Sequence, residues 1–529
     1  MSAQGDCNLN GIDDAVDISS GTSADCNSNG IPDECELGAG TSQVAGSVLV
    51  DSGASGVTSA APILGDRVGF APLALPDLNG DGLSDLAIGV PQRDSSTAEN
   101  VGAVILTGVG PTGASSWASV LDVSVGALGA LEVGDRFGAA LASLGDIDSN
   151  GTLELAVGAP GDDAAGENEG AVWLLRISSG GTLASAGKIA EGSSGFTGSL
   201  ATGDSFGSAV AAIGDLNDDG TPDLAVGAPR HDEDGENTGA VWILFMEPAG
   251  TVLGSTRIDA ASPALLGTLE VGDRFGSSVT LLGDLDLDGT TEIAVGAPRR
   301  DGGVDNGGAV FICSLDAAGQ LVAVQEISGT VGGLSTLPEV GDHFGSSLAC
   351  IGDHNIDGVP DLVVGRPGSD TGGENAGAVD LLLLNTDGTV AGQQLIAEGL
   401  GGFAEDLEVG ADFGAGLASA GDLDGDGFLD LLVGAPRTDS TADNAGALWQ
   451  LTLGSVDNDC DADGIPDECG FDCDGNGQPD ACDIAADASL DCDGDGLLDS
   501  CEIAADASLD CDLDGILDAC EILLDQTLD

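Results

Sequence analysis

The chain has 529 residues, of which 91 are Asp or Glu and only 12 are Lys or Arg, so its formal net charge is −79. This charge excludes a nucleic-acid-binding protein, because backbone phosphates are held by clustered Lys and Arg, and it excludes an anionic membrane surface unless a divalent cation bridges the two. The chain is nevertheless 42% hydrophobic with a mean hydropathy of +0.17, which is too apolar for a disordered acidic tail, so we expect it to fold.

Few side chains are available for catalysis. The only imidazoles are His231, His343 and His354, and the chain has no Tyr. We expect no GxSxG nucleophile elbow, and neither an HExxH zinc motif nor a GxxxxGK[ST] phosphate loop occurs. We therefore expect no enzyme, with a hydrolase of unknown type acting through paired carboxylates as a distant alternative.

Acidic loops of one pattern recur along the whole chain. Asp, Asn or Glu stands at loop positions 1, 3, 5 and 9, and Gly stands at position 6. This spacing wraps the chain around one hard cation, because Gly permits the turn at position 6 and a backbone carbonyl at position 7 completes the oxygen shell. The pattern predicts Ca²⁺ rather than the smaller Mg²⁺, at up to about twelve sites.

Residues 1–40 are predicted to be an N-terminal calcium-loop and Cys segment. Its two loops start 19 residues apart, at Asp6 and Asp25, and position 12 of each is also acidic. The predicted ligands are Asp6, Asn8, Asn10, Asp14, Asp17, Asp25, Asn27, Asn29, Asp33 and Glu36.

Residues 41–454 contain an internal repeat. The segment GDRFGAALASLGDIDSNGTLELAVGAP at 134–160 returns every 69 residues, with a degenerate first copy at 65–91. Within one unit, apolar runs at 206–213, 224–226, 239–244 and 256–258 are separated by Gly, Pro and Asp, which predicts four short strands per unit.

Six such units predict an all-β, six-bladed β-propeller, because a radial array buries both faces of each small sheet. The last unit stops after three strands, and the run Gly46–Val50 ahead of the first unit could supply the fourth and close the ring. Seven blades are the alternative. The predicted propeller ligands are Asp77, Asn79, Asp81, Asp85, Asp146, Asp148, Asn150, Glu154, Asp215, Asn217, Asp219, Asp223, Asp284, Asp286, Asp288, Glu292, Asp353, Asn355, Asp357, Asp361, Asp422, Asp424, Asp426 and Asp430.

The repeat resembles the FG-GAP repeats of the integrin α-subunit β-propeller. A Phe-Gly pair, an acidic loop and a Gly-Ala-Pro follow one another in the family's order, over about three quarters of the chain. The first copy departs with Val68-Gly69-Phe70, and the fifth has Gly365-Arg366-Pro367. The resemblance implies a propeller fold and a role in adhesion, although integrin-like ligand capture would need a partner domain that this chain lacks.

Residues 455–529 are predicted to be Cys-rich calcium-binding repeats. Three of their four loops start 19 residues apart, and the pattern is similar to thrombospondin type 3 and dockerin-like repeats. The predicted ligands are Asp459, Asp461, Asp463, Asp467, Asp472, Asp474, Asn476, Asp480, Asp483, Asp491, Asp493, Asp495, Asp499, Glu502, Asp510, Asp512, Asp514, Asp518 and Glu521.

Most cysteines belong to pairs with eight intervening residues. This spacing is too wide for a zinc knuckle, so disulfides are expected, either within a loop or from one loop to the next. The pairs are Cys26/Cys35, Cys460/Cys469, Cys473/Cys482, Cys492/Cys501 and Cys511/Cys520. Cys313 and Cys350 are expected to be small buried apolar residues, or otherwise a bridge between neighbouring blades.

The fifth unit collects the residues that break the repeat. They are His343, His354, Arg366 and Asp380, the last of which replaces Trp173, Trp242, Phe311 or Trp449 of other units. Features repeated six times are structural by default, so we hypothesise that this blade faces a partner; neutral drift is the alternative.

Taken together, these patterns predict a secreted, calcium-stabilised structural or adhesion protein. The propeller would be a packing or binding platform and the terminal repeats would be connectors, with self-assembly into a surface layer or filament. The alternative is a monomeric adhesin or anchoring module that binds a glycan, a cell-surface protein or a matrix protein. No apolar run reaches the roughly 18–20 residues of a membrane span, and an export signal is not visible in the first residues, so we expect an extracellular or cell-surface location.

Overall fold

The computed structural model describes residues 42–50, 67–95, 99–109, 115–164, 166–232, 236–355, 357–421, 429–439 and 444–455. Several predicted features lie outside these residues. They are the terminal loops starting at Asp6, Asp25, Asp459, Asp472, Asp491 and Asp510, the five predicted cysteine pairs, and the ligands Asp422, Asp424 and Asp426. The boundaries predicted for the two terminal segments remain predictions.

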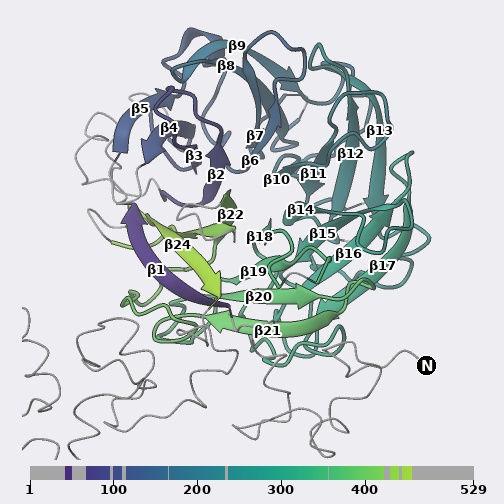
Figure 1. Cartoon of the computed structure of the whole chain (residues 1–529). Helices are drawn as coiled ribbons and strands as arrows, with labels where there is room; N and C mark the ends of the chain where they lie inside the picture. Colours follow the sequence, from purple (N-terminus) through teal and green to yellow (C-terminus); the bar gives the residue numbers. More distant parts are fainter. Residues whose placement is uncertain are drawn as a thin grey trace, which may run out of the picture. The chain divides into compact units, whose positions relative to one another are not determined.

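Six four-stranded antiparallel sheets surround a common centre and form a six-bladed β-propeller (Figure 1). In blades 1 to 5 the four strands follow one another in chain order, and the first strand of each blade lies innermost. The first strands of neighbouring blades contact one another around the centre. The six-bladed fold is therefore confirmed and the seven-bladed alternative is wrong.

The strands have the following bounds. Blade 1 contains β2 (Ala71–Leu75), β3 (Asp85–Val90), β4 (Ala103–Val109) and β5 (Ser115–Leu121); blade 2 contains β6 (Leu141–Gly145), β7 (Leu153–Ala159), β8 (Ala171–Ser178) and β9 (Thr182–Ile189); blade 3 contains β10 (Ala209–Ala212), β11 (Leu224–Ala228), β12 (Ala240–Met246) and β13 (Val252–Asp259). Blade 4 contains β14 (Ser278–Gly283), β15 (Thr291–Ala297), β16 (Ala309–Leu315) and β17 (Leu321–Ser328); blade 5 contains β18 (Leu348–Cys350), β19 (Leu362–Arg366), β20 (Ala378–Leu384) and β21 (Val390–Ile396); blade 6 contains β22 (Gly416–Gly421), β23 (Asp430–Ala435), β24 (Ala447–Ser455) and β1 (Ser42–Val50). One short 3-10 helix, η1 (Gly126–Leu128), precedes blade 2, and no helix in the described ranges is long and apolar enough to cross a membrane.

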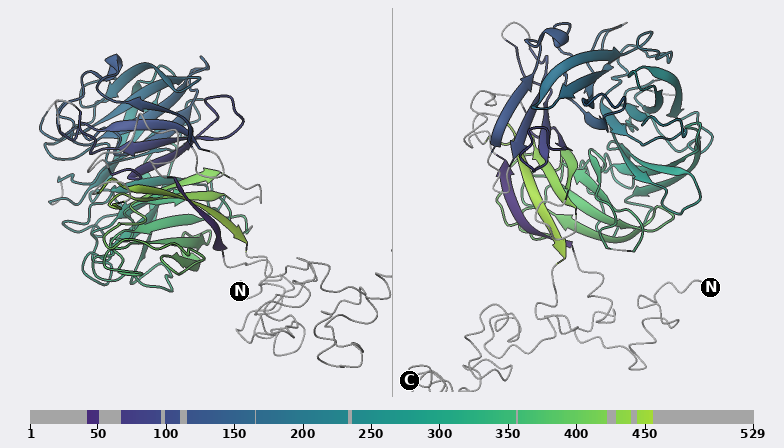
Figure 2. Two further views of the ribbon diagram at one scale, coloured as in Figure 1. Left: turned by 90° about the vertical axis from the view of Figure 1, so that its left-hand side faces the viewer. Right: turned by 45° about the horizontal axis from the view of Figure 1, so that its top comes forward.

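Blade 6 is completed by a strand from the other end of the repeat region. β1 lies beside β24, as the purple and yellow-green strands of Figure 2 show. The sheet order is β1-β24-β23-β22. Val44 of β1 is buried in the core between blades 5 and 6, and its N–H donates to the carbonyl oxygen of Gly401 at 3.0 Å. The predicted ring closure by the run Gly46–Val50 is confirmed.

The Phe-Gly pair of each repeat joins neighbouring blades instead of beginning a strand. We expected a strand over 206–213, but β10 begins only at Ala209 because Phe206 forms a parallel bridge with Gly170 of blade 2. The N–H of Phe206 donates to the carbonyl oxygen of Glu169 at 2.8 Å, and its ring is fully buried. The motif is thus a contact between blades.

Glycine is required where the backbones of neighbouring blades meet. A Cβ on Gly158 would lie 2.0 Å from the carbonyl oxygen of Gly207, and one on Gly170 would lie 2.1 Å from that of Phe206. Both nearby oxygens belong to the backbone, so a side-chain rotation could not relieve the clash with an added Cβ. The equivalent glycines at the other junctions meet the same obstacle, which explains why Phe-Gly and Gly-Ala-Pro recur together.

The core consists of six clusters of buried apolar side chains, each shared by two neighbouring blades. The second and third strands are buried on both faces and therefore read as continuous apolar runs such as AVWILFM in β12. Cys313 and Cys350 carry free thiols within two of these clusters. The expected burial is confirmed for Cys313, whereas Cys350 is only partly buried, and the two do not form a bridge between blades.

Arg366 and Asp380 form a buried ion pair inside blade 5. Their exposed fractions are 2% and 0%, and the guanidinium binds both carboxylate oxygens, with 2.9 Å between Nη2 and Oδ1. Arg366 replaces the alanine, and Asp380 the aromatic residue, that blades 2, 3, 4 and 6 place here. Because both side chains are buried, neither can contact a partner directly, and the hypothesis that blade 5 faces a partner remains a prediction.

Arg366 also lies near a second buried carboxylate, whose equivalent in blade 4 is neutralised by a different cation. Arg366 Nη1 lies 3.6 Å from Asp342, the buried acid that precedes His343 in blade 5. The equivalent Asp273 of blade 4 pairs instead with Arg300, at 2.9 Å. In blades 4 and 5, cations from different repeat positions therefore neutralise the same buried acid.

Arg366→Ala is expected to lower the free energy of unfolding by about 3–5 kcal/mol, because it leaves Asp380 buried without its cation. The double variant Arg366→Ala/Asp380→Trp restores the alanine and tryptophan of blades 2, 3 and 6, and we expect it to recover most of that loss. Urea unfolding followed by circular dichroism measures both changes. A double variant as unstable as the single one would contradict this account.

Candidate metal centres

Each blade carries its acidic loop between its first and second strands. In blade 2 the loop begins at Asp146, directly after β6, and ends at Glu154 within β7. The ligand positions of the loops in blades 1 to 5 are all described, and of the sixth loop only position 9, Asp430, is described. The loops of blades 1 to 5 can therefore be compared directly.

One hydrogen-bond network shapes all five of these loops. In blade 4, the position 1 carboxylate of Asp284 accepts the N–H groups of Asp288 at 3.1 Å and Gly289 at 2.9 Å. Asp286 at position 3 also accepts the N–H of Asp288, at 3.1 Å. The same bonds recur in blades 1, 2, 3 and 5. The backbone thus orients the side-chain oxygens before any ion is bound.

The loops turn through two residues in left-handed conformation. Position 6 has φ between 87° and 93° in all five loops, and it is always Gly, as in Gly289. Position 4 is left-handed in the loops of blades 1 to 4, and in blade 4 it is Leu287, with φ 59° and an exposed fraction of 88%. A leucine in this conformation is strained, because its Cβ crowds the backbone.

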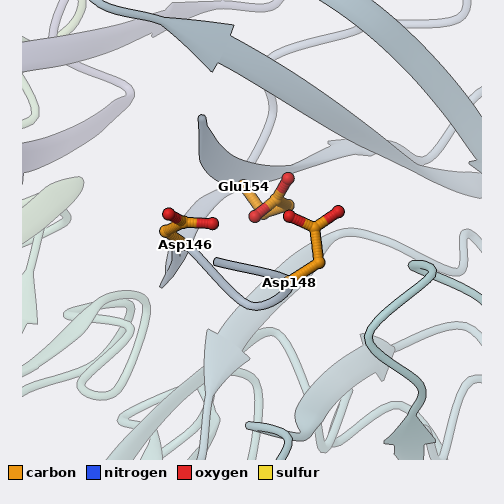
Figure 3. Close-up of side chains that lie close together, drawn as sticks. All are labelled: Asp146, Asp148 and Glu154. Carbon is orange, nitrogen blue, oxygen red and sulfur yellow. The ribbon is translucent and has the colours of Figure 1, made fainter. Parts of the chain in front are cut away.

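Three carboxylates converge in two of the loops. In blade 2, oxygens of Asp146, Asp148 and Glu154 all lie within 4.8 Å of one another, and Figure 3 shows the three groups gathered together. In blade 4 the equivalent residues Asp284, Asp286 and Glu292 are arranged in the same way. The donors are oxygen only, which suits a hard divalent cation and disfavours metals that prefer nitrogen or sulfur.

The residue at position 9 separates the loops into two kinds. Blades 2 and 4 have Glu there, and blades 1, 3, 5 and 6 have Asp. The shorter Asp223 is held at the strand end by two backbone N–H groups, those of Leu216 at 3.1 Å and Met246 at 2.9 Å. Glu154 accepts the N–H of Ile147 at 3.0 Å, and its carboxylate lies close to those of Asp146 and Asp148. Position 3 differs as well, because blade 3 has Asn217 where blade 2 has Asp148. The sequence pattern treated the two residue types as equivalent.

Burial and backbone hydrogen bonds shift the carboxylate pKa values in opposite directions. Burial raises the pKa of Asp223 and of Asp361, both at position 9, to about 6, and it also raises the pKa of Glu154. At position 1, the N–H of Gly82 lowers the pKa of Asp77. The blade 1 loop thus combines an exposed acid, Asp77, whose pKa is lowered with a buried one, Asp85, whose pKa is raised by burial.

The two convergent clusters differ in net charge. In blade 2, Arg176 Nε lies 3.3 Å from Glu154 Oε1 and supplies a competing cation. In blade 4 the equivalent residue is Ser314, and the loop borders a cavity of about 220 Å³ that Asp387 of blade 5 also lines. The blade 4 cluster is therefore the more strongly acidic of the two, and its residues fit a divalent cation best.

One segment has the Gly-x-Ser-x-Gly spacing of a nucleophile elbow, so the expectation that the chain contains no such motif is wrong. Residues 203–207 read GDSFG, but Ser205 precedes a strand, whereas an elbow serine follows one. The hydroxyl of Ser205 donates to the carbonyl oxygen of Gly203 at 3.2 Å, and the nearby His231 bonds to Asp204 at 3.0 Å. The geometry gives this serine no activating base.

Comparison with known proteins agrees with this architecture. Five segments match the model of the FG-GAP repeat, at residues 68–106, 137–175, 206–244, 275–313 and 413–449. The matched segments leave out the fifth repeat, which contains Arg366 and Asp380. The propeller is thus built from FG-GAP repeats.

Similar proteins include integrin alpha chains. The chain is 36% identical over 199 residues to integrin alpha-3 of Cricetulus griseus, which covers 38% of this chain and 17% of that protein. It is 36% identical over 173 residues to integrin alpha-5 of Xenopus laevis, which covers 31% of this chain and 15% of that protein. It is 33% identical over 167 residues to phosphatidylinositol-glycan-specific phospholipase D of Bos taurus, which covers 31% of this chain and 19% of that protein. The chain spans less than a fifth of the length of each of these relatives.

Glu292→Gln is expected to weaken Ca²⁺ binding at the blade 4 loop by about tenfold, or about 1.4 kcal/mol, because it removes one of three converging charges. Equilibrium dialysis of the full chain at a fixed free Ca²⁺ concentration should show fewer ions bound. Glu167→Gln makes the same charge change at an exposed acid outside the loops and should leave binding unchanged. Equal binding by both variants would contradict a blade 4 site.

Leu287→Asn is expected to raise the free energy of unfolding by roughly 0.5–1 kcal/mol, because Asn tolerates the left-handed conformation better than Leu. Leu266→Asn is the matched control, since Leu266 is also exposed (75%) but does not have a positive φ. Thermal unfolding in a chelator measures both variants. A stabilisation of equal size in the control would trace the effect to removal of an exposed apolar group.

Proposed function

We propose that this protein is an extracellular adhesion or structural protein whose six-bladed propeller is a binding platform made rigid by Ca²⁺. The observation that carries the proposal is the convergence of three carboxylates in the loops of blades 2 and 4. Repulsion among these acids opens an empty loop, and a bound divalent cation replaces repulsion with attraction. Ca²⁺ binding would thus stabilise the turns between the first two strands of a blade.

The expected affinity of the Ca²⁺ sites supports an extracellular location for the protein. Ca²⁺ sites in extracellular modules typically bind at about 10⁻⁴ to 10⁻³ M, so they are filled only in a calcium-rich compartment. The predicted cysteine pairs of the terminal segments also favour an oxidising environment. We therefore place the protein outside the cell or at its surface, and its likeness to integrin alpha chains supports an adhesive, non-enzymatic role.

Self-assembly is the form of this proposal that we favour. Similar calcium loops are predicted on both sides of the propeller, and modules of one kind at two places in the chain suit connections between copies. The terminal repeats would be the connectors and the propeller the packing unit of a surface layer or filament.

A monomeric adhesin is the second candidate. The centre of the propeller contains a cavity of about 800 Å³ lined from all six blades, within the usual size range of ligand pockets. In this form the propeller would bind a glycan, or a protein of a cell surface or matrix, without forming a polymer.

Size-exclusion chromatography with light scattering, in Ca²⁺ and again after chelation, separates the two forms, and electron microscopy identifies the species in Ca²⁺. Large regular particles that dissolve on chelation are expected for a self-assembling protein. A compact monomer in Ca²⁺ would reject self-assembly and favour the adhesin. An unfolding temperature that chelation leaves unchanged would overturn the role of Ca²⁺ in both forms.

A further inference from the structure

The basic residues of this acidic chain gather at one mouth of the central channel. Six of the 12 Lys and Arg occupy two repeat positions, the residue before the Phe-Gly pair and the residue after the proline of Gly-Ala-Pro. We call them the arginine ring: Arg67, Arg136, Arg230, Arg274, Arg299 and Arg437. Half of all cationic side chains are thus concentrated at two positions of the repeat.

The arginine ring borders the central cavity of about 800 Å³. All of its members except Arg299 line this cavity, together with small side chains such as Ala142 and Ser278 of the innermost strands. The first ring position lies just before the innermost strand of its blade and the acidic loop lies just after it. The arginine ring and the candidate metal centres therefore lie at opposite ends of these strands.

Most of the arginine ring has no neutralising partner. Arg437 Nε lies 3.0 Å from Asp412 Oδ2, but Arg136, Arg230, Arg274 and Arg299 form no ion pair with any residue that the structure describes. Burial, followed by the charges of Arg299 and Arg230, lowers the pKa of Arg274 to about 10. Like charges are thus held together without compensation, on blades 2, 3 and 4.

The backbone does not account for these arginines. The residue before each Phe-Gly pair or its equivalent has φ between 55° and 59°, a left-handed conformation that costs energy for any residue with a long side chain. Residues of four chemical types occupy this position: Arg67, Arg136, Ser205, Arg274, His343 and Asp412. The fold therefore does not require Arg, and Arg is present despite both strain and repulsion.

We propose that this channel mouth binds a small organic polyanion, one that carries two or more separated sulfate or carboxylate groups. The planar guanidinium group of Arg binds such oxyanions through two parallel hydrogen bonds. The unpaired arginines come from three consecutive blades and are therefore spaced apart. They can bind several anionic groups of one ligand better than they can bind a single group. The cavity beside them has room for the organic body of the ligand.

Isothermal titration calorimetry of the full chain in Ca²⁺ tests the site with sucrose octasulfate as the probe, and with sucrose and inorganic sulfate at matched ionic strength for comparison. Wild-type protein should bind the octasulfate and not sucrose. Arg274→Gln/Arg299→Gln should weaken binding at least tenfold. Asp412→Asn, which removes the only acid at the first ring position among the described residues, should strengthen it several-fold.

Arg176→Gln is the matched control, because Arg176 pairs with Glu154 at the opposite end of blade 2 and should not affect the probe. If the double variant misfolds, Arg136→Gln at an exposed ring position and Asp412→Asn still give opposite predicted shifts. Unchanged affinity in the ring variants, or equal affinity for inorganic sulfate, would overturn the proposal. Binding of a polyglutamate peptide but not of the octasulfate would also overturn it, in favour of an acidic protein partner.

Discussion

The propeller depends on the approach of one blade's backbone to the next at paired glycines. Gly158 and Gly170 leave no room for a side chain because carbonyl oxygens of blade 3 lie about where their Cβ atoms would be. This close approach lets Phe206 bond to the preceding blade through its N–H and bury its ring in the shared core. Each core cluster then belongs to two blades, so no blade is complete alone and the ring must close through β1.

The shape of the acidic loops depends on the propeller architecture. Each one reverses the chain between two strands that are fixed by their neighbours, and it does so with carboxylates that accept the N–H groups of the turn itself. The same atoms that form the turn therefore bring like charges together. Three carboxylates converge in blades 2 and 4, where Asp at position 3 is combined with Glu at position 9, whereas blade 3 has Asn217 and Asp223 at these positions.

Charge is distributed along the axis of each blade rather than evenly over its surface. Acids follow the innermost strands, and most of the arginine ring precedes them. Inside the blades, buried acids are neutralised by cations from different sequence positions, as Arg300 and Arg366 show. Many of the few basic residues lie in blade interiors or at the channel mouth, whereas Arg176 lies beside the blade 2 candidate metal centre.

The sequence by itself determined the period of 69 residues, the four strands per blade, the number of blades and the strand that closes the ring. These follow from the spacing of apolar runs and glycines, because each small sheet can bury its two faces only against copies of itself. Tertiary structure alone decided that Phe206 joins two blades, that Arg366 and Asp380 compensate each other, and that five arginines line one cavity. Those features depend on contacts between residues distant in the chain, and a linear pattern carries no information on which distant residues will face each other.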